Sequence, residues 1–113
     1  MKQEFEKVTL KNVMCEDGEK DITVEIVPFN RRNDDHVDFA FAVSDMFNRL
    51  PSEFRNVSEA AKRFVEVFMV HTEEQANDPK SDFSLVYNDT RAARTLYNSP
   101  SVQKQLSDFF VNA

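Results

Sequence analysis

Glycine, tryptophan, cysteine and histidine are scarce in this chain. Its 113 residues include one Gly, one Cys, two His and no Trp. A single glycine excludes the glycine-rich loops that cradle phosphates, and the G-x-S-x-G nucleophile elbow is missing as well. Two His and one Cys cannot build a zinc site of the usual Cys/His type within one chain. The sequence therefore lacks most of the motifs from which catalysis is recognised.

Disulfides and membrane spans have no basis in this composition either. Cys15 is the only cysteine, so no intrachain disulfide can form, which is typical of a reducing compartment. No apolar run reaches the roughly 18 residues of a membrane-spanning helix. The first residues, 1–6, lack the apolar stretch of a signal peptide. We therefore expect a cytoplasmic protein without a membrane partner.

The length and the charge balance narrow the function classes further. A chain of 113 residues fits a single domain, over residues 1–113, with a core of its own. The net charge is −6, from 14 Lys and Arg against 20 Asp and Glu. Non-specific affinity for nucleic acid comes mainly from cationic side chains, so nucleic acid is an unlikely partner. We interpret the acidity as a solvated surface, with an acidic face for a basic partner as the alternative.

Alternating apolar residues predict a β-hairpin over about 7–28. These residues all fall on even positions, the period of a strand with one buried face: Val8, Leu10, Ile22, Val24 and Ile26. The only glycine of the chain lies between the two arms. A three-residue loop over 16–18, with Gly18 in the left-handed region, would pair Val8 with Ile26 and keep the apolar set on one face.

Helical spacing and capping residues predict four helices after the hairpin, over about 36–50, 57–75, 80–97 and 100–111. Asp34 or Asp35 can cap the first helix, and Pro51 stops it. Asn56 and Glu59 resemble a capping box before the second helix. A residue with capping ability followed by proline precedes each of the last two helices.

The pairs that precede the last two predicted helices are Asp78-Pro79 and Ser99-Pro100, in which the first residue can cap the helix and proline takes its first position. The β-branched and aromatic run over 64–70 leaves a strand as the alternative to helix at that point. The fold class that these elements predict is α+β, with an N-terminal hairpin followed by four helices.

Phenylalanine is unusually frequent, at eleven residues. The predicted helix over 36–50 is apolar around most of its circumference, which indicates central burial or a surface shared with a partner. A core of this size needs some of the rings, and we expect the surplus to bind a protein partner or a second copy of the chain. The candidate interface residues are Phe39, Phe41, Met46, Phe47, Phe68, Met69, Phe109 and Phe110.

Two polar groupings could support a different chemistry. The first is Asp34, Asp35, His36 and Asp38, because carboxylates and imidazole can hold a divalent metal. The simpler interpretation is a helix N-terminus that attracts carboxylates. The second grouping is His71 and Glu74, one turn apart on the predicted second helix, where they could share a proton or a metal. A metal-dependent hydrolase is therefore an alternative function.

A third grouping combines cations with aromatic rings on the predicted helix over 80–97. Arg91 and Arg94 lie there together with Tyr87 and Tyr97. Guanidinium and aromatic groups can stack on bases, so weak nucleic-acid binding is one interpretation. A protein interface and a plain solvated face are the others.

The function that we predict from the sequence is a small, acidic, non-enzymatic protein–protein interaction module of the adaptor, inhibitor or assembly-chaperone type. We expect no cofactor and no small-molecule substrate. A hairpin followed by helices, at this chain length, resembles the general plan of the small tail-assembly chaperones of tailed phages. The resemblance lies in architecture and size, without a shared motif, and it implies an assembly role and a phage origin.

Overall fold

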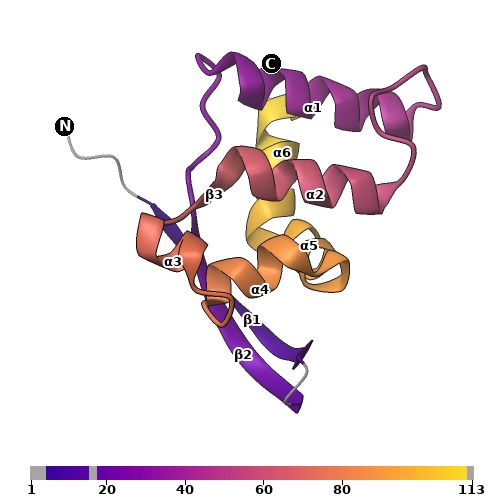
Figure 1. Cartoon of the computed structure of the whole chain (residues 1–113). Coiled ribbons are helices and arrows are strands. Elements are labelled where there is room, and N and C mark those ends of the chain that lie inside the picture. Colours follow the sequence, from indigo (N-terminus) through magenta and orange to yellow (C-terminus); the bar gives the residue numbers. More distant parts are fainter. Residues whose placement is uncertain (1–4, 16–17, 112–113) are drawn as a thin grey trace.

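The hairpin and the helices form two sides of one core. The computed structural model describes residues 5–15 and 18–111. Strands β1 (Glu6–Cys15) and β2 (Gly18–Ile26) pair antiparallel, and the short strand β3 (Met69–Val70) pairs antiparallel with β2, in the order β1-β2-β3. The helices gather on one side of the hairpin, and the end of the hairpin extends beyond them (Figure 1).

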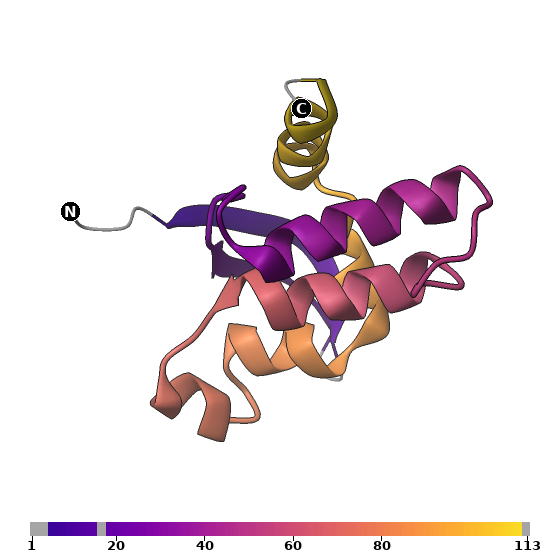
Figure 2. The same ribbon diagram turned by 90° about the horizontal axis from the view of Figure 1, so that it is seen from above.

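The α+β class is confirmed, but the number of helices is six rather than four. They are α1 (Asp34–Phe47), α2 (Val57–Phe68), α3 (Glu73–Asn77), α4 (Asp82–Asn88), α5 (Thr90–Tyr97) and α6 (Pro100–Val111). Helices α1 and α2 run side by side, and α6 packs behind them (Figures 1 and 2). No helix among the described residues is long and apolar enough to cross a bilayer.

The predicted helix over 57–75 was wrong beyond Phe68, because the chain joins the sheet there. The carbonyl of Phe68 accepts the Val27 N–H at 2.9 Å, and Met69 then pairs with Ile26. A new capping box at Thr72 starts α3. The alternative of a strand within the β-branched run is thus correct for its last two residues.

The predicted helix over 80–97 is divided by a capping residue. Asp89 ends α4 and starts α5, and its carboxylate accepts the N–H groups of Arg91 and Ala92 at 2.8 and 3.3 Å. Ser81, not Asp78, caps α4, and Asn33, not Asp34 or Asp35, caps α1. The capping residue Asn56 and the helix over 100–111 lie where the sequence predicts them.

The predicted hairpin register is also wrong, by two residues. Val8 pairs with Val24 instead of Ile26. One residue of this shift arises at the turn, because Gly18 pairs with Cys15 instead of lying in the loop, and the other arises at a bulge that interrupts β1 between Leu10 and Val13. Asn12 in the bulge has a φ of 55°, a left-handed conformation that Asn tolerates better than most residues. The bulge moves Val13 onto the buried face. Gly18 has the expected positive φ, and residues 16–17 of the predicted loop lie outside the described residues.

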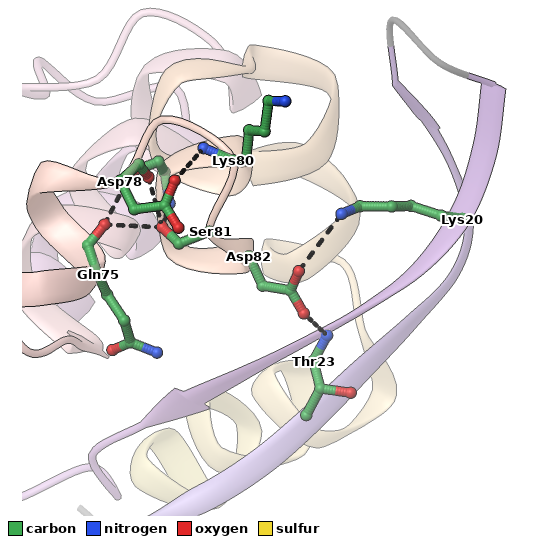
Figure 3. Close-up of polar contacts among 8 residues, drawn as sticks. Lys20, Thr23, Gln75, Asp78, Lys80, Ser81 and Asp82 are labelled. Carbon is green, nitrogen blue, oxygen red and sulfur yellow. Dashed lines mark hydrogen bonds and ion pairs between the residues drawn. The ribbon is translucent and has the colours of Figure 1, made fainter.

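Asp82 closes the part of the β2 edge that β3 does not reach. Its carboxylate accepts the Thr23 N–H at 3.0 Å and lies 3.6 Å from the Lys20 ammonium (Figure 3). The turn that positions Asp82 is held by the Ser81 hydroxyl, which donates to the carbonyls of Gln75 and Asp78 at 2.7 and 2.9 Å. A side chain of α4 thus replaces the missing strand partner.

The bulge gives a first prediction. Asn12→Val should lower the free energy of unfolding by about 1–2 kcal/mol, because a β-branched residue is strained at a positive φ. Asn12→Gly is the control, since glycine adopts this conformation freely. Chemical denaturation measures both. Equal stability of Asn12→Val and the wild type would show that the bulge does not require a left-handed residue.

Asp82 gives a second prediction. Asp82→Ala should lower the free energy of unfolding by about 1 kcal/mol, because the Thr23 N–H loses its acceptor. Asp82→Asn keeps an oxygen that can accept this bond and should retain most of the stability. Denaturation combined with amide hydrogen exchange at Thr23 measures the effect. Unchanged exchange in Asp82→Ala would contradict the proposed closure of the edge.

Candidate functional site

Half of the candidate interface residues lie in the core rather than on a surface. Phe39, Phe68, Met69 and Phe109 are each at most 8 % exposed. Phe68 stacks on Phe64 with ring centroids 4.7 Å apart, and Phe39 meets the edge of Phe68 at 5.5 Å. These rings fill the space between the hairpin and the helices, so a partner cannot reach them in the folded protein.

The remaining candidates lie on α1 and α6 at the surface. Phe41, Phe47 and Phe110 are 56 %, 66 % and 40 % exposed, and Met46 is half-buried. Phe41 meets the edge of Phe109 at 6.1 Å, and Phe110 meets Phe109 at 5.1 Å. The exposed rings of Phe41 and Phe110, with the edge of Phe109 between them, form what we call the α1–α6 aromatic surface.

An arginine fixes one side of this surface. The Arg31 guanidinium lies 5.3 Å from the centre of the Phe109 ring and donates to the Phe109 carbonyl at 3.2 Å. A cation above an aromatic face is held by the quadrupole of the ring. Phe29 also contacts Phe109, with ring centroids 4.6 Å apart. The position of Phe109 under the surface is therefore determined by contacts from the β2–α1 connection as well as from α1.

The first polar grouping is not assembled into a metal site. His36 is buried and lies with its ring stacked on Phe68 at 4.2 Å, while Asp34, Asp35 and Asp38 are exposed. The His36 Nδ1 accepts the Asn30 N–H at 3.0 Å and is thus occupied by the backbone. Over residues 5–15 and 18–111, no three His, Cys, Asp or Glu side chains gather closely enough to hold a metal.

The second polar grouping is likewise separated by the fold. His71 and Glu74 were expected one turn apart on one helix, but His71 lies before the cap of α3 and only Glu74 lies within it. The His71 ring stacks on Phe83 at 4.2 Å. Both residues are exposed. His71 is therefore better described as a surface ring that covers Phe83.

The third grouping divides into exposed cations and separate aromatic rings. Arg91 and Arg94 are exposed on α5. Tyr97 lies in the core at 1 % exposure and meets the edge of Phe39 at 6.3 Å, whereas Tyr87 belongs to α4 and stacks on Phe83. The fold thus provides no platform of two tyrosines beside the two arginines, and base stacking by this set is not supported.

Several exposed apolar residues were missed by the sequence analysis. Leu50 was assigned to the first helix, but the helix ends at Phe47 and Leu50 is 56 % exposed in the following turn. Val111, next to Phe110, is 77 % exposed. The sequence offered one indication of an exposed Leu50, since the predicted helix over 36–50 has more apolar residues than one buried stripe can hold. Val111 carried none, because a helix end of this kind is as compatible with burial as with exposure.

Comparison with known proteins adds no assignment. No protein-family model, curated protein or solved structure matches this chain. The candidate site therefore depends on its own geometry.

His36 gives a third prediction. Burial lowers the pKa of His36 below its ordinary value of 6.5, against an opposing effect of the Asp35 charge. The unfolded chain therefore takes up this proton at higher pH than the folded protein. The stability that the neutral ring contributes is complete above about pH 6.5 and is lost as the pH falls toward the lowered folded pKa.

The measurement is the free energy of unfolding as a function of pH. His36→Gln should flatten the fall in stability between about pH 7 and pH 5, because Gln does not titrate. The free energy of unfolding of each variant is expressed relative to its own value at about pH 7, so that a loss of stability common to all pH values cancels. His71→Gln is the matched control for removal of an imidazole. A wild-type slope in His36→Gln would contradict the assignment.

Proposed function

We propose that this protein is a non-enzymatic protein–protein interaction module that binds through the α1–α6 aromatic surface. The observation that carries the proposal is the exposure of Phe41 and Phe110, at 56 % and 40 %, on two different helices around one buried ring. Covering a phenylalanine completely is worth roughly 1.5–3 kcal/mol. Adjacent exposed rings are accordingly typical of interaction sites rather than of solvated surfaces.

The contact geometry supports this use of the surface. Phe29 and Arg31 both contact the Phe109 ring, so the exposed rings of Phe41 and Phe110 pack against a residue whose position is fixed. A surface that is already ordered loses little conformational entropy on binding. Phe41 projects from the middle of α1 and remains more than half exposed despite its contact with Phe109.

The partner that we propose for this surface is a second copy of the chain. Around a twofold axis, Phe41 of each copy can contact Phe110 of the other, so one surface supplies both halves of the interface. Two rings per chain are a small apolar contribution, and the association should therefore be weak and dependent on concentration. Adaptor, inhibitor and assembly-chaperone roles, including that of the phage tail-assembly chaperones, would use the same surface. The lone cysteine fits a cytoplasmic location.

The fourth prediction tests self-association. Absolute mass by light scattering after size exclusion, over about a hundredfold range of concentration, should rise above that of one chain. Phe41→Ser combined with Phe110→Ser should keep the protein monomeric throughout this range. Both side chains are exposed, so the double variant should lose less than about 1 kcal/mol of unfolding free energy.

Met14→Ser is the matched control, because Met14 is 59 % exposed on β1 and lies outside the aromatic surface. This variant should associate like the wild type. A wild type that stays monomeric at every concentration would contradict the second copy as the partner. Association that survives in the double variant would place the interface elsewhere, and Phe47 with Leu50 would be the next residues to change.

A further inference from the structure

A hollow of about 540 Å³ lies between β1, α5 and the start of α6. Three cationic side chains line it: Lys11 from β1, and Arg91 and Arg94 from α5. None of the described residues that line it carries a carboxylate. On a chain with a net charge of −6, this is an unusual concentration of positive charge. The hollow is separate from the α1–α6 aromatic surface.

The two arginines have no acidic partner within the described part of the chain. No ion pair among residues 5–15 and 18–111 includes Arg91 or Arg94, although Lys11 pairs with Asp21 at 3.2 Å. The Asp89 carboxylate accepts backbone N–H groups at the start of α5 and is occupied there. With respect to the described residues, both guanidinium groups therefore remain able to neutralise a bound anion.

Neutral donors lie beside these cations. Thr9, Thr95, Asn98 and Ser99 also line the hollow. Two of their hydroxyls have partners already, since Thr95 donates to the Arg91 carbonyl at 2.9 Å and Thr9 bonds to the Thr23 hydroxyl at 3.0 Å. The Ser99 hydroxyl oxygen is buried and has no hydrogen-bond partner among the described residues. A buried hydroxyl without a partner is costly, and rotation of the Ser99 side chain toward the hollow would let an oxygen of a bound anion accept its proton. Ser99 directly precedes α6, whose helix dipole adds to the positive potential at this end.

Two acids near the hollow have other contacts, and the first of them, Asp21, pairs with Lys11 at 3.2 Å. The Glu6 carboxylate accepts hydrogen bonds from the Ser101 hydroxyl and from the Gln105 side chain, the latter at 2.7 Å. Glu6 does not line the hollow. The Glu6 charge lowers the electrostatic potential near the first turn of α6, but the Glu6 carboxylate forms no ion pair with Arg91 or Arg94.

The shape and lining favour a compact anion over a nucleic acid. No aromatic side chain lines the hollow, since Tyr97 is in the core and Tyr87 stacks on Phe83. Bases would therefore find no ring to stack on. The acidic remainder of the molecule repels a long polyanion, whereas a single phosphate group senses mainly its neighbours within a Debye length.

We propose that this hollow binds the phosphate group of a small phosphorylated molecule. Arg91 and Arg94 would hold the phosphate oxygens, as the planar guanidinium fits such oxygens in pairs. Lys11 lies beside them with its ammonium paired to Asp21, and the Ser99 side chain would turn toward the phosphate and donate its hydroxyl. The volume of the hollow exceeds that of one phosphate and leaves room for a small attached group.

The experiment uses inorganic phosphate and pyrophosphate as probes on the full chain. Each is titrated at constant ionic strength, with chloride as the reference, and amide chemical shifts and the melting temperature are recorded. Both probes should raise the melting temperature, because a ligand of the native state stabilises it. The largest amide shifts should fall on Thr95, Asn98 and Ser99. Pyrophosphate should bind more tightly than phosphate.

Arg91→Gln combined with Arg94→Gln should weaken pyrophosphate binding by at least about tenfold, since charge-assisted bonds to both side chains are lost. Both residues are exposed, and circular dichroism checks that the variant is folded. Arg55→Gln is the matched control, because Arg55 is exposed outside the hollow, and it should bind like the wild type. Equal binding by the double variant would overturn the site.

Two other outcomes would also overturn the proposal. One is the absence of any shift with millimolar pyrophosphate beyond that of chloride. The other is tighter binding of a single-stranded oligonucleotide than of pyrophosphate, with shifts that extend beyond the hollow, because a nucleic acid would then be the ligand class. The amide shifts of the wild type locate the site independently of the arginine variants.

Discussion

The stack of Phe64 on Phe68 is the contact on which the other elements of this fold depend. The two rings lie one helical turn apart on α2, with centroids 4.7 Å apart. Phe39 of α1 contacts both rings, edge-on at Phe68 and tilted at Phe64, and His36 lies against Phe68. Phe29 extends the contact from Phe68 toward α6. One helix face thus joins the sheet, α1 and α6, which explains why the chain needs so many phenylalanines and only a few leucines.

Seven of the eleven phenylalanines are buried or half-buried, and four are exposed. The division follows from geometry, because the core on one side of a short sheet accepts a single stripe of each helix. On α1 that stripe contains Phe39 and Val43, and Phe41 projects away from it. The exposed rings are therefore a remainder that the fold does not require, and this is the physical basis for assigning them to a partner.

The sequence predicted element type well where one periodicity dominates, as in the hairpin and α6. It failed where tertiary contacts compete with local preference. Met69 continues an apolar helical pattern, but pairing with β2 satisfies its backbone better than another helical turn. In the sequence Asp89 cannot be distinguished from other polar helix residues, whereas in the structure its carboxylate caps α5. The register depended on the pairing of Gly18 at the turn and on the bulge at Asn12. In the sequence the bulge leaves only an indirect sign, because the buried apolar residues of β1 fall on even positions up to Leu10 and on an odd position at Val13. For the candidate interface, the sequence showed that the predicted helix over 36–50 is apolar around most of its circumference. It did not show which of these apolar residues the other elements of the fold cover.

Helix α6 connects the two surfaces to which we assign binding. Its first residue, Pro100, lines the cationic hollow, and Phe110 near its last turn belongs to the aromatic surface. Twelve helical residues span about 18 Å, which is longer than the Debye length of about 8 Å at physiological ionic strength. An anion at the first end therefore changes the electrostatic potential at the second end very little. Between the ends, the Gln105 side chain accepts the Phe29 N–H and donates to Glu6, so the middle of the helix is held to both the β2–α1 connection and β1. A helix fixed in this way keeps each end in place independently, and loss of binding at one surface should leave binding at the other unchanged.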